Sequence, residues 1–385
     1  MADTPDTPDQ DLWLGIDLGT QGVRALAVTG DGRVLGRGSA PLAGERDGDR
    51  HEQQPSRWWE GVGTAVREAL RPPAAARVRG VAVCGTSGTV LLADPRGTPL
   101  TPALMYDDSR AAAEARDAQE AGAEVWARLG YRIQPSWALA KLLWLVRRNG
   151  AATAGLRGAR VCHQADFVTT RLVGRPVPTD SSHALKTGYD PRGRTWPRAL
   201  HEQLGLSGLD FPEVVAPGTV LGTVGAEAAA FTGLAEGTPV VAGMTDGCAA
   251  QLASGAWDIG QWNTVLGTTL VIKGVTAEPL TDPAGVLYNH RSADGNWLPG
   301  GASSVGAGAL ARAFPGPTWP AWTAPPPATS PRACSPTRWC RGASASPSWP
   351  PTPSPSPWAP RRATATCTRR CCRGWRSWNG CAWRT

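Results

Sequence analysis

The sequence lacks several features that would place it in a membrane, in a secreted disulfide-rich class or around a structural metal. It has no apolar run of about 18 residues, so we expect no membrane-spanning segment. Residues 1–11 are acidic and contain no apolar core of a secretory signal, which favours a cytoplasmic protein. The three cysteines before residue 315 show no paired spacing, so we interpret Cys84, Cys162 and Cys248 as reduced, buried thiols. The histidines show no metal-ligand spacing, so we interpret His51, His163 and His183 as ordinary polar or core residues.

Negative charge is also missing, but only from the C-terminal part of the chain. Residues 315–385 contain ten arginines, no lysine and no acidic residue, whereas the whole chain carries a net charge of +7. The remaining residues, 1–314, therefore have a net charge of −3. The high isoelectric point is thus no argument for a nucleic-acid partner, and DNA binding by the arginine-rich tail is a minor alternative.

The C-terminal part has no hydrophobic periodicity beyond Phe314. One interpretation is a proline-rich disordered linker. Eight tryptophans in residues 315–385 fit disorder poorly. We favour translation out of frame in GC-rich DNA, because a shifted reading of residues 336–349 permits an ordinary globular sequence with an acid and aromatic residues.

The length of 385 residues allows two domains with a cleft between them. Alternating apolar residues predict strands, and longer amphipathic runs predict helices. We expect strands at 12–18, 22–29, 33–38, 78–84, 90–93 and 99–106, helices at 55–70, 110–129 and 136–148, and strand-rich segments at 213–245, 261–273 and 286–299.

The most informative segment is the predicted hairpin that contains Leu14 to Arg24. Its turn places Asp17, Gly19, Thr20, Gln21 and Gly22 at one tip. Glycine lets a ligand approach the backbone closely, and the amides and the threonine hydroxyl can donate to phosphate oxygens. The carboxylate of Asp17 suits a magnesium ion, which prefers hard oxygen ligands.

Three further glycine-flanked polar clusters follow predicted strands, at residues 85–89, 245–247 and 267–269. Each alone is compatible with a surface turn. Because ligand sites form where several strand ends converge, the repeated pattern predicts one shared cleft.

The order of these motifs resembles the FGGY carbohydrate kinases, which belong to the actin-like, ribonuclease-H-like ATPase superfamily. The resemblance covers about residues 12–314. The matching segments are Gly15-Ile-Asp17-Leu-Gly-Thr20, His51-Glu-Gln-Gln-Pro55 with Trp58-Trp59, Ser136-x-x-x-x-Lys141-Leu-x-Trp144, Asp180-x-Ser182-x-Ala184-Leu-Lys186-Thr-Gly188-Tyr189, Ala242-Gly-x-Thr245-Asp246-Gly247, Leu266-Gly267-Thr268-Thr269 and Pro299-Gly-Gly-Ala302.

The resemblance implies an α/β protein with the actin-like fold, two domains around a cleft and an incomplete second domain. We expect a disordered N-terminus at 1–11, a sugar-binding domain at 12–245, the start of an ATP-binding domain at 246–314 and an aberrant tail at 315–385. The implied activity is transfer of the γ-phosphoryl group of ATP to a sugar hydroxyl, with Mg²⁺ as cofactor. The partner is then a small-molecule sugar, and a homodimer is left open.

The resemblance also implies roles for individual residues. Asp246 would be the general base that accepts the proton of the attacking hydroxyl. A helix N-cap is the alternative role for Asp246. Asp17 would bind magnesium-ATP, Gly19 and Thr20 would bind its phosphates, and Gly267, Thr268 and Thr269 would form the second phosphate loop. Gln21, Gly22, Ser87 and Asp108 would bind the sugar, with Asp107 as a substitute for Asp108, whereas Lys141 and Trp144 are interpreted as structural.

The choice of sugar and two alternatives to this function stay open. Cys84-Gly-Thr-Ser87, Leu104-Met-Tyr106 and Ala184-Leu-Lys-Thr-Gly-Tyr189 favour the ribulose-kinase-like branch, with xylulose as the second choice of substrate. A catalytically inactive remnant that binds sugar or nothing is the main alternative. An actin-like or chaperone-like ATPase is the second, and the sugar-side pattern of Ser87, Asp108 and Asp246 argues against it.

Overall fold

The computed structural model describes residues 10–71, 74–149, 155–266, 270–303 and 306–307. By its contacts the chain divides between Pro315 and Gly316, and all described residues belong to the first unit. The expected aberrant tail at 315–385 lies outside the described residues, as do residues 1–9 of the expected disordered N-terminus.

The centre of the described part is a six-stranded mixed sheet. The predicted hairpin is confirmed, with an antiparallel register from Leu12 opposite Thr29 to Leu18 opposite Val23. Alternate side chains of its first strand are buried, as the alternating pattern requires. The sheet order is β12-β13-β6-β1-β2-β3, with β6 parallel to both β1 and β13. The bounds are β1 Leu12–Leu18, β2 Gly22–Thr29, β3 Val34–Pro41, β6 Val78–Gly85, β12 Val220–Thr223 and β13 Pro239–Val241.

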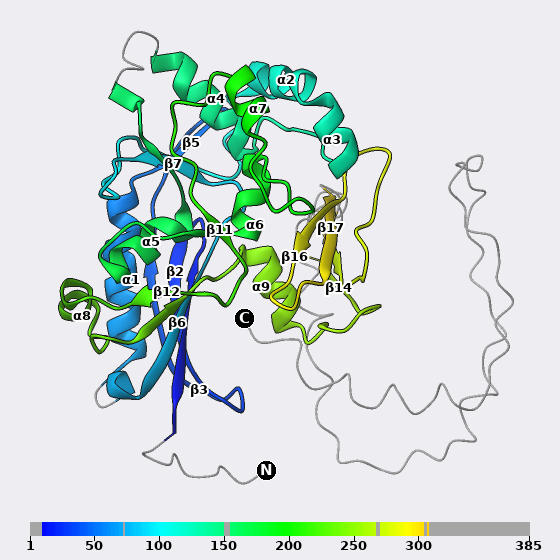
Figure 1. Cartoon of the computed structure of the whole chain (residues 1–385). Coiled ribbons are helices and arrows are strands. Elements are labelled where there is room, and N and C mark those ends of the chain that lie inside the picture. The colour runs from blue at the N-terminus through cyan, green and yellow to red at the C-terminus, as the bar shows by residue number, and fades with distance from the viewer. Residues whose placement is uncertain (1–9, 72–73, 150–154, 267–269, 304–305, 308–385) are drawn as a thin grey trace, which may run out of the picture. The chain divides into compact units, whose positions relative to one another are not determined.

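Three helices lie together on one side of this sheet (Figure 1). They are α1 Pro55–Ala69, α5 Gln164–Val173 and α8 Ala226–Thr232. The first was predicted from the proline at its start and its amphipathic pattern, and it buries Trp58 and Val62 in the core. The other two were not predicted, because α5 is buried along most of its length and α8 is only seven residues long.

A second layer is built on a five-stranded sheet of order β4-β5-β8-β7-β9. Its strands are β4 Glu45–Asp47, β5 Arg50–Gln53, β7 Val90–Ala93, β8 Ala103–Leu104 and β9 Arg160–His163. The helices of this layer, at the top of Figure 1, are α2 Ala112–Ala121, α3 Ala123–Leu129, α4 Ala138–Asn149 and α7 Arg198–Gln203. The short elements of this layer are β10 Thr179–Asp180, α6 Ser181–Ala184, η3 Leu185–Thr187 and β11 Val214–Val215, whereas η1 Ala74–Arg77 directly precedes β6 and packs against the core of the central sheet.

The prediction of one helix over 110–129 was wrong, because two helices meet at Gly122. A side chain at this position would clash with the indole of Trp126, since an added Cβ would lie 2.3 Å from Trp126 Nε1. The indole instead donates a 2.7 Å hydrogen bond to the carbonyl of Ala118. The buried tryptophan therefore requires a glycine, and with it the break between the helices.

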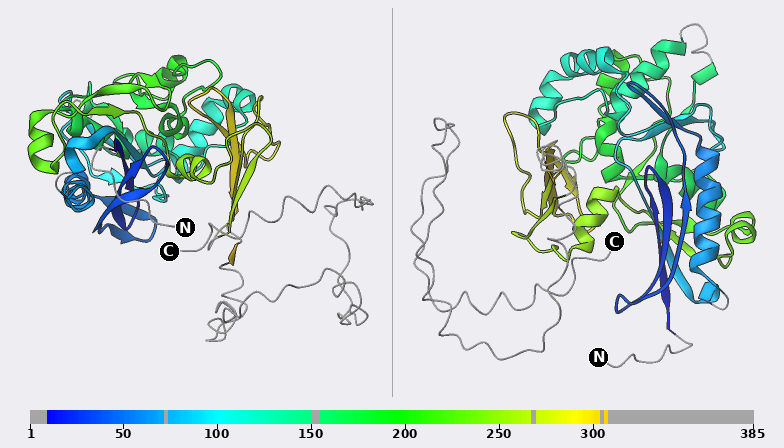
Figure 2. Two further views of the ribbon diagram at one scale, coloured as in Figure 1. Left: turned by 90° about the horizontal axis from the view of Figure 1, so that it is seen from below. Right: turned by 180° about the vertical axis from the view of Figure 1, so that it is seen from behind.

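The last described elements are one helix and a four-stranded antiparallel sheet. They are α9 Asp246–Ala253, β14 Trp262–Leu266, β15 Leu270–Gly274, β16 Tyr288–Arg291 and β17 Trp297–Ser303, in the sheet order β14-β15-β17-β16. In both Figure 1 and Figure 2, α9 lies between this sheet and the central sheet. Met244 and Cys248 pack there against Val275 and Leu298 in a small core of their own.

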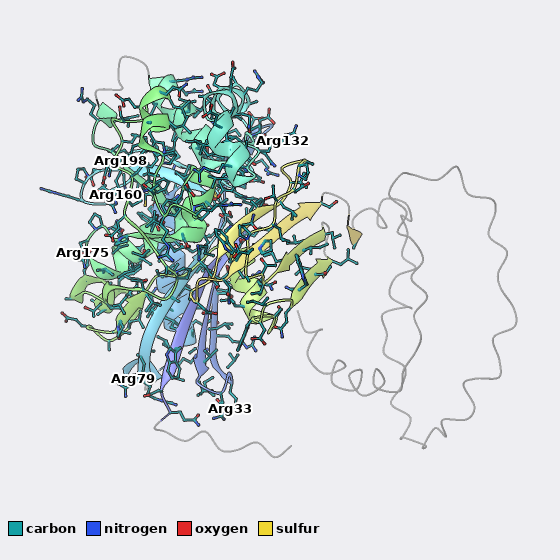
Figure 3. All side chains as sticks on the ribbon, turned by 45° about the vertical axis from the view of Figure 1, so that its right-hand side comes forward. Arg33, Arg79, Arg132, Arg160, Arg175 and Arg198 are labelled. Atoms are coloured by element: carbon teal, nitrogen blue, oxygen red, sulfur yellow. The ribbon has the colours of Figure 1, made fainter. Side chains whose placement is uncertain are left out.

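The surface charge of the described part is spread out. The six arginines labelled in Figure 3 lie at separated points, from the end of the central sheet to the helical layer. Three of them form ion pairs with nearby carboxylates: Arg33 with Asp31, Arg79 with Asp11 and Arg160 with Asp210. No helix in the described ranges is both long and apolar enough to cross a bilayer.

The approach of β6 to the chain before α9 depends on Gly243. A Cβ at this position would lie 2.0 Å from the carbonyl oxygen of Val83. We expect Gly243→Ala to lower the free energy of unfolding by about 1–3 kcal/mol through overpacking, measured by urea denaturation. Gly15→Ala is the control, because Gly15 lies in the same sheet with nothing within 4 Å of an added Cβ. Equal stability of the two variants would contradict this packing constraint.

Candidate active site

The tip of the hairpin is a tight turn between β1 and β2. Gly19 N–H donates to the carbonyl of Gly22 over 3.0 Å, which closes the turn. A Cβ on Gly22 would lie 2.9 Å from the carbonyl oxygen of Ala40, so a glycine is needed where β3 passes the tip. Thr20 is partly buried and Gln21 is exposed. The tip therefore presents the polar side chains of Thr20 and Gln21 at a fixed position.

A buried chain of hydrogen bonds fixes this tip to the second layer. Trp58 Nε1 donates to Gln53 Oε1 over 2.7 Å, and Gln53 Nε2 donates to the carbonyl of Thr20 over 2.8 Å. Gln53 lies at the end of β5 and Trp58 in α1. The matched segment around residues 51–59 thus has a structural role, because it holds the predicted phosphate loop in place.

The loop after β6 contains Ser87. Its neighbour Thr86 is held by the side chain of Gln164, which accepts from both Thr86 N (2.9 Å) and Thr86 Oγ1 (2.8 Å). Ser87 Oγ itself is buried and has no hydrogen-bond partner among the described residues. The carbonyl of Ser87 accepts a 3.2 Å hydrogen bond from Lys186 Nζ. The loop is therefore held in place through Thr86 and through the carbonyl of Ser87, whereas the hydroxyl of Ser87 is available to a ligand.

Asp246 is the first residue of α9, and it is exposed. The N-cap residue of α9 is Thr245, so the alternative interpretation of Asp246 as the N-cap is wrong. One oxygen of Asp246 accepts from the N–H of Gly247 over 2.7 Å. The helix N-terminus favours the ionised carboxylate, which is the form that a general base needs.

A buried network fixes the start of α9. Thr245 N–H donates to Ser182 Oγ over 2.8 Å, and Ser182 Oγ donates to Asp180 Oδ1 over 2.5 Å. Asp180 also pairs with His183 Nδ1. Thr245 in addition forms a parallel β-bridge with Gly85 at the end of β6. These contacts place Asp246 next to the Ser87 loop.

Two carboxylates of the site, Asp17 and Asp246, interact electrostatically. Burial and the carboxylate of Asp246 both raise the pKa of Asp17, against the weaker opposing effect of Arg24 at 3.4 Å. The same surroundings raise the pKa of Cys84 to about 12, through burial and then through the nearby carboxylates Asp17, Asp180 and Asp246. Cys84 is therefore a neutral thiol. Cys84, Cys162 and Cys248 are all free, as expected, but Cys84 is only partly buried.

The contacts of Asp108 argue against its predicted role as a sugar ligand. Its side chain is completely buried. One oxygen accepts from His51 N (2.9 Å) and from Arg110 Nη2 (2.8 Å), and Arg110 Nε binds the other oxygen. Asp107 is partly exposed and pairs with His51 Nδ1 and Arg46. The two acids thus anchor their own segment.

Tyr106 is a site residue that the sequence analysis did not single out. It is 40% exposed, and its hydroxyl contacts the side chain of Thr20. Burial and the carboxylate of Asp107 raise the pKa of Tyr106, with a further contribution from Asp246. Tyr106 therefore lies next to the hairpin tip and within the electrostatic influence of Asp246, and the motif Leu104-Met-Tyr106 gave no indication of these contacts.

The remaining predictions around the site concern Lys141, Trp144, possible metal ligands and residues 267–269. Lys141 is fully buried and donates to the carbonyls of Gly88 (3.0 Å) and Met105 (2.5 Å), so it is structural as interpreted. Trp144 is covered by the guanidinium of Arg110 at 4.5 Å. No cluster of three or more possible metal ligands occurs among the described residues. Gly267, Thr268 and Thr269 lie outside the described residues.

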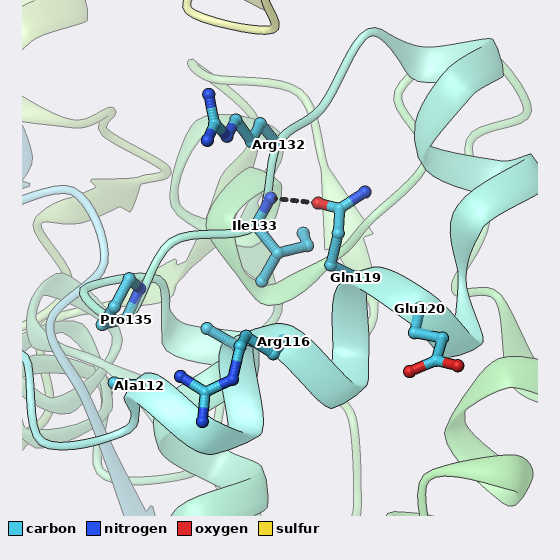
Figure 4. A pocket seen from close by; sticks show the side chains of 8 residues that line it. Ala112, Arg116, Gln119, Glu120, Arg132, Ile133 and Pro135 are labelled. Atoms are coloured by element: carbon cyan, nitrogen blue, oxygen red, sulfur yellow. Dashed lines mark hydrogen bonds between the residues drawn. The ribbon is translucent and has the colours of Figure 1, made fainter.

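Two surface cavities of the described part contain none of the predicted site residues. One, of about 420 Å³, lies between α2 and residues 132–135 (Figure 4). Gln119 Oε1 closes one side of it by accepting from Ile133 N over 2.8 Å. The other, of about 630 Å³, lies between the segment after β3 and α1. Neither cavity is lined by the residues that surround Asp246.

Comparison with known proteins gives a consistent result. The sequence model described as "FGGY family of carbohydrate kinases, N-terminal domain" matches residues 12–253. A xylulose kinase from Streptomyces coelicolor is 33% identical over 297 residues, which cover 75% of this chain and 59% of that protein. A gluconokinase from Bacillus subtilis is 25% identical and covers 76% of this chain and 57% of its own length.

The solved structures agree with the sequence comparison. The crystal structure of xylulose kinase from Rhodospirillum rubrum has a TM-score of 0.72 and 27% identity, and the match covers 78% of this chain and 62% of that one. The chain therefore spans about three fifths of the length of the relatives it matches. These likenesses confirm the α/β actin-like fold expected from the motifs.

The anchor of α9 is tested by two neighbouring serines. Ser182→Ala removes the acceptor of the buried Thr245 N–H, so we expect the free energy of unfolding to fall by about 1–3 kcal/mol. Ser181→Ala is the matched control, since Ser181 Oγ has no partner among the described residues and its loss changes stability by less than about 0.5 kcal/mol. Urea denaturation measures both, and the anchor is refuted if the two variants lose stability equally.

The Asp180–His183 pair predicts a pH dependence of stability. Burial opposes the charged imidazole, but the carboxylate of Asp180 outweighs it and raises the pKa of His183 to about 9. A histidine pKa above its ordinary value of 6.5 stabilises the fold fully below pH 6.5 and loses this effect as the pH rises to about 9. The stability difference between the wild type and His183→Gln should shrink over this range by on the order of 3 kcal/mol. A difference that does not change with pH would show that His183 is neutral in the fold.

Proposed function

The chain belongs to the FGGY family of carbohydrate kinases, and from this premise we propose that it transfers the γ-phosphoryl group of ATP to a hydroxyl of a pentulose. The observation that carries the proposal is the position of Asp246, at the N-terminus of α9 and in electrostatic contact with Asp17 of the hairpin. One carboxylate is then available to the acceptor hydroxyl and the other to the nucleotide.

The proposed chemistry needs few groups beyond these. Asp246 accepts the proton of the attacking hydroxyl, within hydrogen-bond reach of it. Ser87 Oγ, buried and unpartnered, donates to the sugar. Thr20, Gly19 and Gly22 cradle phosphate oxygens, and the remaining polar side chain of the tip, Gln21, faces the sugar. In-line phosphoryl transfer depends on such positioning and charge neutralisation more than on covalent chemistry.

Magnesium fits the hairpin side of the site. Asp17 has a raised pKa because burial and a second carboxylate oppose its charge, and a divalent cation would relieve both effects. Magnesium characteristically takes one or two carboxylates and fills its remaining positions with water and phosphate oxygens. Asp17 would therefore hold the ion, which supplies charge neutralisation to the phosphates of ATP.

The sugar is the finer part of the proposal. The sequence motifs ranked ribulose before xylulose, whereas xylulose kinases stand among the relatives at 33% and 27% identity. We therefore propose D-xylulose as the first substrate to test and D-ribulose as the second. The domain assignment stays a proposal as well, with residues 12–245 as the sugar-binding part and 246–314 as the beginning of the ATP-binding part.

The kinase proposal predicts a specific loss in Asp246→Asn. The variant keeps the shape of the side chain but cannot accept a proton, so kcat should fall by at least about a hundredfold with a small change in KM. The measurement is ADP release by the full chain with ATP, Mg²⁺ and either pentulose. Asp258→Asn is the control, because Asp258 is exposed beyond the end of α9 and should leave kcat unchanged.

Two outcomes would overturn the proposal. If the wild-type chain binds a pentulose without sugar-dependent ADP release, the inactive, sugar-binding alternative is correct. If Asp246→Asn retains the wild-type rate, another group accepts the proton and Asp246 has a structural role.

A further inference from the structure

The chain has only three lysines, and none of them serves as an ordinary surface charge. They are Lys141, Lys186 and Lys273, whereas the surface cations are arginines. Lys141 is satisfied by two carbonyl oxygens. Lys186 and Lys273 form no ion pair with a carboxylate among the described residues, which is unusual for cations held inside a fold.

Lys273 reaches its position because two glycines leave room for it. A Cβ on Gly300 would lie 2.6 Å from Lys273 Cγ, and a Cβ on Gly247 would lie 3.3 Å from Lys273 Cε. The aliphatic part of Lys273 therefore passes from β15 along β17 to the first turn of α9. Its side chain is buried, with 7% of the residue exposed.

The ammonium group of Lys273 ends among groups that do not neutralise it. Its Nζ lies 3.2 Å from His290 Nδ1 and 3.6 Å from Cys248 Sγ. Burial and the charges of Lys273 and Lys186 lower the pKa of His290, so this imidazole is neutral. His290 Nε2 is buried and has no hydrogen-bond partner in the described part of the chain.

Lys186 approaches the same place from η3. Its Nζ donates to the carbonyl of Ser87 and lies 5.6 Å from the centre of the Tyr288 ring. Burial lowers the pKa of Lys186 to about 8, and the positive charge of Lys273 adds to this effect while Asp246 opposes it. The two lysines are therefore close enough to repel each other.

The charges around this cluster leave a positive excess. Asp180 is balanced by His183, and Asp246 is the remaining carboxylate that acts on Lys186. Two ammonium groups thus face one carboxylate. Three buried polar atoms nearby lack protein partners among the described residues: Ser87 Oγ, His183 Nε2 and His290 Nε2. Buried polar groups normally find partners, so this set indicates a ligand that carries oxygen acceptors.

We propose that Lys186, Lys273, His290 and Ser87 form a binding site for a compact oxyanion, a carboxylate or a phosphate, beside Asp246. An acidic group borne by a small acceptor molecule, or free phosphate, is the ligand of this chemistry. This site shares Ser87 with the proposed sugar site and in that respect rests on the proposed function. Anion binding requires neither ATP nor phosphoryl transfer, so a titration without nucleotide distinguishes its failure from a failure of the kinase proposal.

The scarcity of lysine makes the test direct. Full-length protein labelled with ¹³C-lysine contains three labelled side chains, and the variants Lys186→Met and Lys273→Met each remove one NMR signal and assign it. Titration with inorganic phosphate or D-gluconate should shift the Lys186 and Lys273 signals and leave the Lys141 signal in place. Sorbitol, a neutral polyol of similar size to gluconate, and sodium chloride at equal ionic strength are the controls.

The variants give the expected magnitude. Each loses one charge-assisted hydrogen bond, so the dissociation constant for the bound anion should rise about tenfold or more. Saturation by gluconate alone identifies a carboxylate site, and saturation by phosphate alone identifies a phosphate site. The proposal is wrong if neither anion moves the two signals beyond the chloride control, if sorbitol moves them equally, or if the Lys141 signal shifts with them. The wild-type titration decides this even where a variant fails to fold.

Discussion

The hydrogen bond from Thr245 N–H to Ser182 Oγ is the contact on which the geometry of the site depends. It joins α6, in the second layer, to the first residue before α9, and the bridge between Gly85 and Thr245 adds the end of β6. Because β1 lies beside β6, the hairpin with Asp17 is placed relative to the same point. Elements from three distant parts of the sequence thus converge on a buried donor that has no alternative partner in water.

The same elements bring two carboxylates and two ammonium groups close together. On the hairpin side, Asp17 and Asp246 form a pair of carboxylates with little opposing charge, which suits a cation and its phosphates. On the far side, Lys186 and Lys273 form a pair of ammonium groups without carboxylate partners among the described residues. Asp246 acts electrostatically on both Asp17 and Lys186, so a molecule that brings a hydroxyl to it is oriented by the electrostatic field as well as by hydrogen bonds.

The sequence predicted the parts of this arrangement that depend on local patterns. The hairpin alternates buried and exposed residues, and α1 begins at a proline, so both were found. The helix pair around Gly122 was missed because a single glycine does not by itself predict a break, and only the structure shows that Trp126 packs directly against it. Asp108 carries the polar side chain expected of a sugar ligand, and only the tertiary structure shows that Arg110 occupies it. Tyr106 reaches the site through a contact with Thr20 that no spacing encodes.

The same reasoning explains why the two lysines escaped the sequence analysis although Lys186 lies in a matched motif. A lysine in a sequence is normally a solvated surface charge, and its meaning changes only when burial removes the water. The clearance for Lys273 comes from Gly247 and Gly300, which are 53 residues apart and which were assigned to two separate turns. Once the side chain is placed between them, these glycines no longer need a ligand to explain their small size. They are required because the side chain of Lys273 passes between them to reach His290 and Cys248. The positive part of the site therefore depends on specific packing, as the carboxylate part does.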